Sequence, residues 1–383
     1  MVGRRPLLPF VLVVLLAGTL TSCLAVPGDT AKVVKIDSAD VDGWHFDYYR
    51  NLAYPCSIRG YQTFAIGTRI GSSATANRPL WVKMRGGGVG WFDEDGQPQP
   101  TAGNKSEIDL TTMLNFDTPG LMASVKAAPE GFRLLLVSMC SHDVYGGNNN
   151  NDPHNPNTTP DGKPRLTTGL ISTKAAVQFA RGAYPTTKYF LHGTSAGGAG
   201  SLHVAWALQQ QGIPPAGLVS DSGVINHAWE SDAVAQGACP PDPDKQRGAV
   251  ALRIDPDVIK AENQPDNLVA RGDLTVPVMH VWNHADQNSC GSTPMQCHLR
   301  DGSTVTLGAA DCRHENLRRA IAGLGAGSRS VNMPVCVTAS GGPVCGVHVV
   351  TTRANGVNTD PAAPRDYQAA ILTWVRARLA DSS

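Results

Sequence analysis

The 383-residue sequence has no excess of charge of either sign, since Lys and Arg together number 32 and Asp and Glu together number 32. Without a basic surplus there is no positive field to attract nucleic acid or an anionic surface, so we expect no nucleic-acid partner. Internal repeats and heptads are also missing, which argues against solenoids and coiled coils. With 17% charged and 42% hydrophobic residues, the chain is expected to form a globular core.

The N-terminal segment has no apolar run long enough for a comfortable membrane span. A basic pair at residues 4–5 precedes the apolar run Leu7–Ala17, which is typical of a secretory signal. The following Leu20–Cys23 resembles the bacterial lipobox, whose cysteine becomes the lipidated first residue. Ordinary cleavage after Ala25 is the alternative and would give a secreted chain. We expect residues 1–23 to be a signal peptide with a lipidated Cys23, and the lipid to be the chain's only contact with the membrane.

The nine cysteines include no C-x-x-C pair, and this absence in an exported chain argues against zinc. We therefore expect no metal, and nothing in the sequence calls for a cofactor. Without Cys23, an even set remains, which favours disulfides. Only the first two of this set precede the serine motif described next, so we pair Cys56 with Cys140. The disulfide candidates are Cys56, Cys140, Cys239, Cys290, Cys297, Cys312, Cys336 and Cys345.

A Gly-x-Ser-x-Gly motif occupies Gly193–Gly197, one residue after the apolar and aromatic run Tyr189–Leu191. Beyond the motif, apolar residues recur at helical spacing, so the pattern changes from strand to helix across Ser195. This is the context of a nucleophile elbow, in which small neighbours allow a sharp turn and leave the hydroxyl exposed. The amide of Ala196, at the start of the helix, can donate to an oxyanion. A glycine-rich turn with a surface serine is the alternative reading.

Short apolar runs alternate with helical stretches along the rest of the chain. This alternation predicts an α/β fold with a mostly parallel sheet, helices on both faces and long disulfide-tied loops. We expect residues 24–49 to be a linker and residues 50–383 to form one domain. Strands are expected at 80–84, 134–137, 189–192, 217–219, 278–282 and 335–337, helices at 174–181, 202–211, 315–324 and 365–380, and surface loops that can rim a pocket at 97–108, 146–163 and 232–247.

Candidates for the acid and base of a serine hydrolase follow Ser195 in the order Asp, then His. Asp286 comes shortly after the fifth expected strand, and His348 comes shortly after the sixth. Asp221, just past the fourth expected strand, is the rival acid, although a turn aspartate often bonds only local amides. The other two histidines after Asp286 are His298 and His314, which stand in polar stretches and are expected on the surface.

A glycine-rich loop, Arg85–Trp91, follows the first expected strand, where unhindered amides can complete an oxyanion hole. This loop and five other stretches, taken in order, resemble the pectin acetylesterase and Notum carboxylesterase family of α/β-hydrolases. The likeness covers roughly residues 50 to 350. The stretches that carry it are Cys56–Tyr61, Gly86–Gly88 with Trp91, Cys140–Gly147, Gly193–Gly198, Ser220–Gly223 and Cys345–His348.

The resemblance implies roles for individual residues. Ser195, Asp286 and His348 would form the catalytic triad, while Asp221 and Asp143 would be structural. The amides of Gly87, Gly88 and Ala196 would form the oxyanion hole, and the candidates for a substrate pocket are Trp91, Asp143 and Tyr145. The sequence departs from the family pattern in the loop: Arg85 stands where the family has Glu, Val89-Gly90 are inserted, and Phe92 replaces a cysteine.

The sequence as a whole predicts an exported serine carboxylic ester hydrolase that forms an acyl-enzyme on Ser195. The resemblance points to acetyl esters on a polysaccharide such as pectin. The alternative is a fatty acyl ester on a protein or lipid, since Notum-like members act on such esters. The rival of another class is an inactive hydrolase-fold lipoprotein that binds at the cell surface. We expect a monomer.

Overall fold

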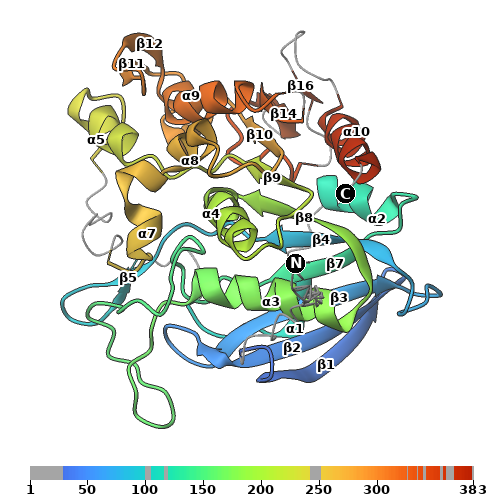
Figure 1. Cartoon of the computed structure of the whole chain (residues 1–383). Coiled ribbons are helices and arrows are strands. Elements are labelled where there is room, and N and C mark those ends of the chain that lie inside the picture. Colours follow the sequence, from blue (N-terminus) through green and yellow to red (C-terminus); the bar gives the residue numbers. More distant parts are fainter. Residues whose placement is uncertain are drawn as a thin grey trace, which may run out of the picture.

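A large twisted sheet forms the centre of the molecule (Figure 1). The computed structural model describes residues 29–99, 105–115, 120–241, 252–325, 327–333, 335–339, 342–353, 357–358 and 366–381. Within these residues the sheet has nine strands, in the order β1-β2-β3-β7-β4-β8-β9-β10-β13. Their bounds in that order are Val33–Val41, Trp44–Pro55, Tyr61–Arg69, Arg133–Val137, Arg78–Met84, Thr186–Thr194, Gly217–Asp221, Val278–Trp282 and Arg329–Asn332.

The strands from β7 to β13 run parallel, and β1, β2 and β3 extend the sheet antiparallel. All five residues of β7, β9 and β10 are buried. A strand covered on both faces is mostly apolar on both, which explains why most residues of these segments are hydrophobic. The predicted α/β architecture with a mostly parallel sheet is confirmed.

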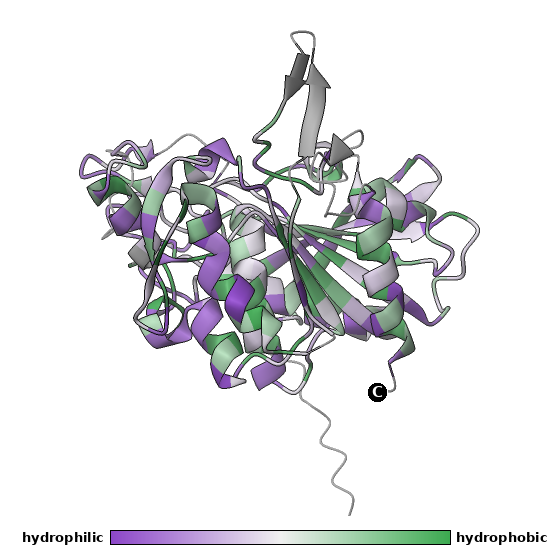
Figure 2. Cartoon of the chain, turned by 90° about the horizontal axis from the view of Figure 1, so that it is seen from above, coloured by the Kyte–Doolittle hydropathy of each residue, from purple (hydrophilic) through white to green (hydrophobic). Residues whose placement is uncertain are grey.

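Helices cover both faces of the sheet, and the apolar strand residues lie between the two helical layers (Figure 2). On one face pack α3 (Gly169–Ala183), α4 (Ala196–Gln210), α8 (Pro265–Arg271) and α9 (Ala309–Ala322). On the other pack α1 (Leu110–Leu114), α2 (Leu121–Ala127) and α10 (Tyr367–Ala380). The remaining elements are α5 (His227–Ala235), α7 (Pro256–Ile259), β5 (Trp91–Phe92), β6 (Pro98–Gln99), β11 (Pro294–His298), β12 (Thr304–Gly308), β14 (Val335–Ala339), β15 (Gly342–Val344), β16 (Val357–Asn358) and the 3-10 turns η1 (Ala261–Asn263) and η2 (Gln287–Ser289).

A separate small apolar cluster joins α5, the β11–β12 hairpin and the start of α9. Two disulfides lie in this region. The predicted pairing of Cys56 with Cys140, elsewhere in the fold, is confirmed. Cys345 is disulfide-bonded as well, whereas Cys23 and the Cys336 side chain lie outside the described residues. The disulfides are Cys56–Cys140, Cys239–Cys290 and Cys297–Cys312.

Three expectations from the sequence need correction. Residues 33–49, expected as linker, form β1 and the start of β2; the edge strand β1 has no buried residue, so its sequence shows no apolar alternation. The strand 335–337 belongs to a small sheet with β15 and β16, and β13 takes its place in the central sheet. His314, expected on the surface, is fully buried in α9.

In the described part of the chain no helix is both long and apolar enough to cross a membrane.

Candidate active site

Ser195 lies between β8 and α4, at the carboxyl end of the parallel strands. Its φ of 53° and ψ of −121° are strained for a residue with a side chain. Two backbone hydrogen bonds hold this conformation: the Ser195 amide donates to the Asp221 carbonyl at 2.8 Å, and the Ala199 amide donates to the Ser195 carbonyl at 3.0 Å. The result is the sharp strand-turn-helix geometry that exposes a nucleophile.

Glycine is required where the elbow packs against neighbouring backbone. A Cβ on Gly193 would overlap the Gly197 carbonyl oxygen, and a Cβ on Gly223 would overlap the Ser195 carbonyl oxygen. Both overlaps are with backbone, so any larger residue would have to displace the turn that carries Ser195. The motif glycines are therefore packing requirements of the elbow.

The loop after β4 passes directly beside the nucleophile. A Cβ built on Gly86 would lie 2.9 Å from the Ser195 Cβ, and the Gly86 amide donates to the Thr194 hydroxyl at 3.1 Å. The following Gly87 and Gly88 have φ values of 154° and 76°, which favour glycine. These two residues directly follow Gly86 along the loop, and Ala196 is the first residue of α4. Their role as oxyanion donors stays a prediction.

Asp286, His348 and Ser195 form an unbroken chain of hydrogen bonds. His348 Nδ1 donates to Asp286 Oδ2 at 2.8 Å, and His348 Nε2 lies 2.7 Å from Ser195 Oγ. The carboxylate is fully buried and also accepts from the Ser289 hydroxyl at 2.9 Å and the Asn288 amide at 2.9 Å. A charge-bearing acceptor fixed in this way leaves Nε2 as the free acceptor for the serine proton.

Asp221, the rival acid, holds the loop that follows the base. Its carboxylate accepts from the Val350 amide at 3.2 Å, and from the Thr351 amide at 2.7 Å and hydroxyl at 2.6 Å. Because the Asp221 carbonyl also accepts the Ser195 amide, one residue anchors both the nucleophile turn and the segment after His348. This geometry suits the structural role that the family resemblance implies.

Lys83 and His192 lie buried beneath this loop, on neighbouring strands of one sheet face. His192 Nε2 is 2.9 Å from the Thr351 hydroxyl and 3.5 Å from Lys83 Nζ. Burial lowers the pKa of Lys83 to about 7, opposed by the charge of Asp221. Burial, and then Lys83, also lower the pKa of His192 well below its usual value.

The three residues expected to line a pocket have almost no exposed surface: Trp91 is 4% exposed, and Asp143 and Tyr145 are 0% exposed. The Asp143 carboxylate accepts from the amides of Tyr145, Gly147 and Gly169 at 3.1, 3.1 and 2.7 Å. Their contacts fit support of the surrounding loops, and so deep a burial leaves little surface for a substrate.

Several residues that shape the site were missed from the sequence, namely Ser289, Arg313, Thr351, Lys83 and His192. Ser289 stands three residues after Asp286, so a local side-chain bond between them was a readable signal. The others act across long sequence separations and leave no local pattern. No three His, Cys, Asp or Glu side chains gather as metal ligands in the part of the chain that is described.

No family model matches the sequence, and no curated protein matches it. Among solved structures, the Wnt deacylase Notum from Drosophila matches with a TM-score of 0.52 and 15% identity over 90% of this chain and 93% of that chain. A thermostable esterase from Pseudomonas putida matches at 0.49 and 11%, covering 94% and 89% of the two chains. Carboxyl esterase 2 from the fungus Tuber melanosporum matches at 0.47 and 14%, covering 89% and 88%. The chain therefore has the α/β-hydrolase fold, which it shares with Notum.

Proposed function

We propose that this chain is a serine carboxylic ester hydrolase, with Ser195 as nucleophile, His348 as general base and Asp286 as the group that orients the imidazole. The observation that carries the proposal is the pair of short hydrogen bonds, 2.8 Å and 2.7 Å, that link Asp286 through His348 to Ser195. The strained elbow and the fold shared with a structure described as a deacylase support it.

The reaction follows from these positions. Ser195 Oγ attacks the ester carbonyl carbon while His348 Nε2 takes the hydroxyl proton, and the amides of Gly87, Gly88 and Ala196 stabilise the oxyanion. Collapse of the intermediate breaks the bond to the alcohol, which leaves with the proton from His348. Water, deprotonated by the same imidazole, then attacks the acyl-enzyme and releases the carboxylic acid. The attacks by Ser195 and by water both need the neutral imidazole as base, so turnover falls at acid pH.

We propose acetyl esters on a polysaccharide such as pectin as the substrate, on the strength of the six matching sequence stretches. Fatty acyl esters on a protein or lipid are the second candidate, supported by the structural likeness to a Wnt deacylase. A panel of p-nitrophenyl esters from acetate to palmitate separates the two, beside acetate release from acetylated pectin and xylan. Preference for long chains, with no acetate released, would reject the first candidate.

Labelling by a fluorophosphonate probe tests the chemistry itself. The wild-type chain should be labelled and should hydrolyse p-nitrophenyl acetate, while Ser195→Ala should be dark and slower by several powers of ten. An unlabelled wild-type chain without esterase activity would favour the inactive binding lipoprotein. Equal rates for the two chains would refute the proposal outright.

Export as a lipoprotein is part of the same proposal. Disulfides at three described cysteine pairs suggest an oxidising compartment. Cys23→Ser should move the chain from the detergent phase to the aqueous phase in a partition assay. An unchanged partition would show that Cys23 is not lipidated.

A further inference from the structure

Arg313 of α9 lies at the far end of the hydrogen-bond chain that reaches Ser195. Its Nη1 donates to the Ser289 hydroxyl at 3.0 Å, and that hydroxyl donates to Asp286 Oδ2 at 2.9 Å. The same carboxylate oxygen accepts from His348 Nδ1. A guanidinium, a hydroxyl, a carboxylate, an imidazole and a nucleophile are thus connected in one line.

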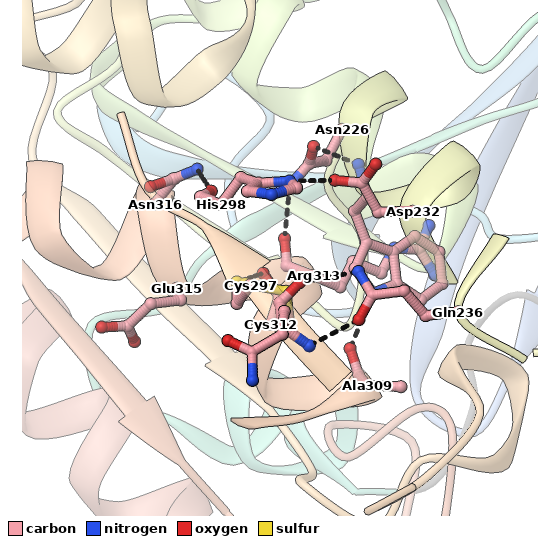
Figure 3. The surroundings of a disulfide bond; sticks show 12 residues. Asn226, Asp232, Gln236, Cys297, His298, Ala309, Cys312, Arg313, Glu315 and Asn316 are labelled. Carbon is pink, nitrogen blue, oxygen red and sulfur yellow. Dashed lines mark hydrogen bonds and ion pairs between the residues drawn. A yellow bond between two sulfur atoms is a disulfide. The ribbon is translucent and has the colours of Figure 1, made fainter. Parts of the chain in front are cut away.

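The surroundings of Arg313 fix the guanidinium in this place. Its carbon centre lies 5.0 Å from the centroid of the Trp229 ring, a cation–π contact. The Arg313 carbonyl accepts from the Asn226 side chain at 3.2 Å, and the preceding Cys312 is bonded to Cys297 (Figure 3). Helix, ring and disulfide together leave the side chain little freedom to turn away.

Apart from Arg313, few charged groups of the surrounding described elements lie near the Asp286–His348 pair. Asp286 is its direct partner, and His314 of α9 lies near it in turn, with His280 of β10 2.9 Å from His314. Burial lowers the pKa of His280 to about 3 and holds the pKa of His314 well below its usual value, so both are neutral near pH 7. Glu230 of α5 acts on Arg313. Among these described groups, Arg313 is the one that is positively charged at neutral pH.

We propose that Arg313 is a positioning residue that acts through Ser289: it holds the Asp286 carboxylate in line with His348. The inference rests on the proposed function. Ser289 transmits the effect because its hydroxyl bonds both partners.

The test is the kcat and KM of each variant for p-nitrophenyl acetate, measured at a pH where the wild-type rate is constant. For Arg313→Met, we expect kcat to fall about tenfold. KM should change little, because the guanidinium touches no substrate. Arg313→Lys keeps a positively charged donor and should restore most of kcat.

A double-mutant cycle shows whether the effect passes through Ser289. Ser289→Ala alone should lower kcat by a similar factor, and adding Arg313→Met should then lower kcat little further, because the two residues act as a unit. Arg318→Met is the matched control: Arg318 stands on the same helix, is 42% exposed and pairs with Glu315, so its kcat and KM should equal those of the wild type.

A wild-type kcat in Arg313→Met, or additive effects of the two substitutions on kcat, would overturn the inference. If Arg313→Met fails to fold, Arg313→Lys and Ser289→Ala decide it, since the former should keep most of the wild-type kcat and the latter should show the fall in kcat. The outcomes remain separable from the proposed function. If Ser195→Ala stays active, the proposed function fails. If Ser195→Ala is inactive but Arg313→Met keeps the wild-type kcat, only the role of Arg313 fails.

Discussion

The two halves of the site are built by different means. The nucleophile half, Ser195 with β8 and α4, is shaped by backbone hydrogen bonds between parallel strands and by glycines that let chains touch. The acid–base half, Asp286 and His348 with their loops, depends on side-chain hydrogen bonds and on disulfides at Cys290 and Cys345. A parallel sheet fixes the geometry of a turn that directly follows one of its strands. Loops that extend away from the sheet need disulfides and side-chain hydrogen bonds of their own to hold their conformation.

We expect the largest difference between the two halves when the two aspartates, Asp286 and Asp221, are each replaced by asparagine. Asp286→Asn should lower kcat by about 10⁴-fold with the fold intact, because an amide lets the imidazole adopt the wrong tautomer. Asp221→Asn removes an acceptor of the loop amides, so it should mainly lower stability, by about 1 to 3 kcal/mol. Steady-state kinetics with thermal unfolding of each variant gives the comparison. The assignment of the acid reverses if Asp221→Asn is the folded but inactive variant.

Gly223→Ala tests the backbone packing of the nucleophile half. The added Cβ meets the Ser195 carbonyl oxygen, so we expect a loss of more than about 4 kcal/mol or no folded chain at all. Gly212→Ala is the control, since no atom lies within 4 Å of its Cβ position, although its φ of 72° carries some strain. Urea unfolding should separate the two widely; similar midpoints would mean that the elbow yields more easily than its packing indicates.

Replacing both Cys239 and Cys290 with serine removes their disulfide and tests whether it holds the acid–base half in place. Stability should fall by about 2 to 4 kcal/mol, and kcat should fall too, because Cys290 directly follows the turn that holds Asp286. Cys56→Ser with Cys140→Ser is the control. The two sequence separations, 51 and 84, predict entropic terms within about 0.5 kcal/mol of each other. Equal kcat losses would remove the distinction between the halves.

The last expected effect is on stability alone and concerns the buried Lys83, which lies beneath the segment that follows His348. Its pKa is about 7 in the folded chain and near 10.5 when unfolded. Between these values the unfolded chain binds more protons, so this group makes stability rise with pH from about 7 to about 10.5. The unfolding free energy of the wild type minus that of Lys83→Met should therefore increase with pH across that window. A constant difference would mean that Lys83 is charged in the folded state throughout.

The sequence predicted well what is local and poorly what is not. Ser195 stands in a contiguous strand-turn-helix pattern, and the buried strands around it are mostly apolar. The edge strand β1 has no buried residue and no regular apolar alternation, and the short β13 (Arg329–Asn332) has one apolar residue, so neither shows a period. His314 was readable after all, because Leu317 and Ile321 follow it at helical spacing on the buried face. Arg313 and Ser289 meet only through the tertiary fold.

Asp221 bonds the nucleophile turn with its carbonyl and the segment after His348 with its carboxylate. We therefore expect a fluctuation of β9 to carry both catalytic groups in the same direction and to leave their separation almost unchanged. If the two contacts of Asp221 were removed, Ser195 and His348 would move independently and would be aligned for a smaller fraction of the time. We expect the temperature dependence of kcat to show this change as a more negative activation entropy, with the activation enthalpy nearly preserved.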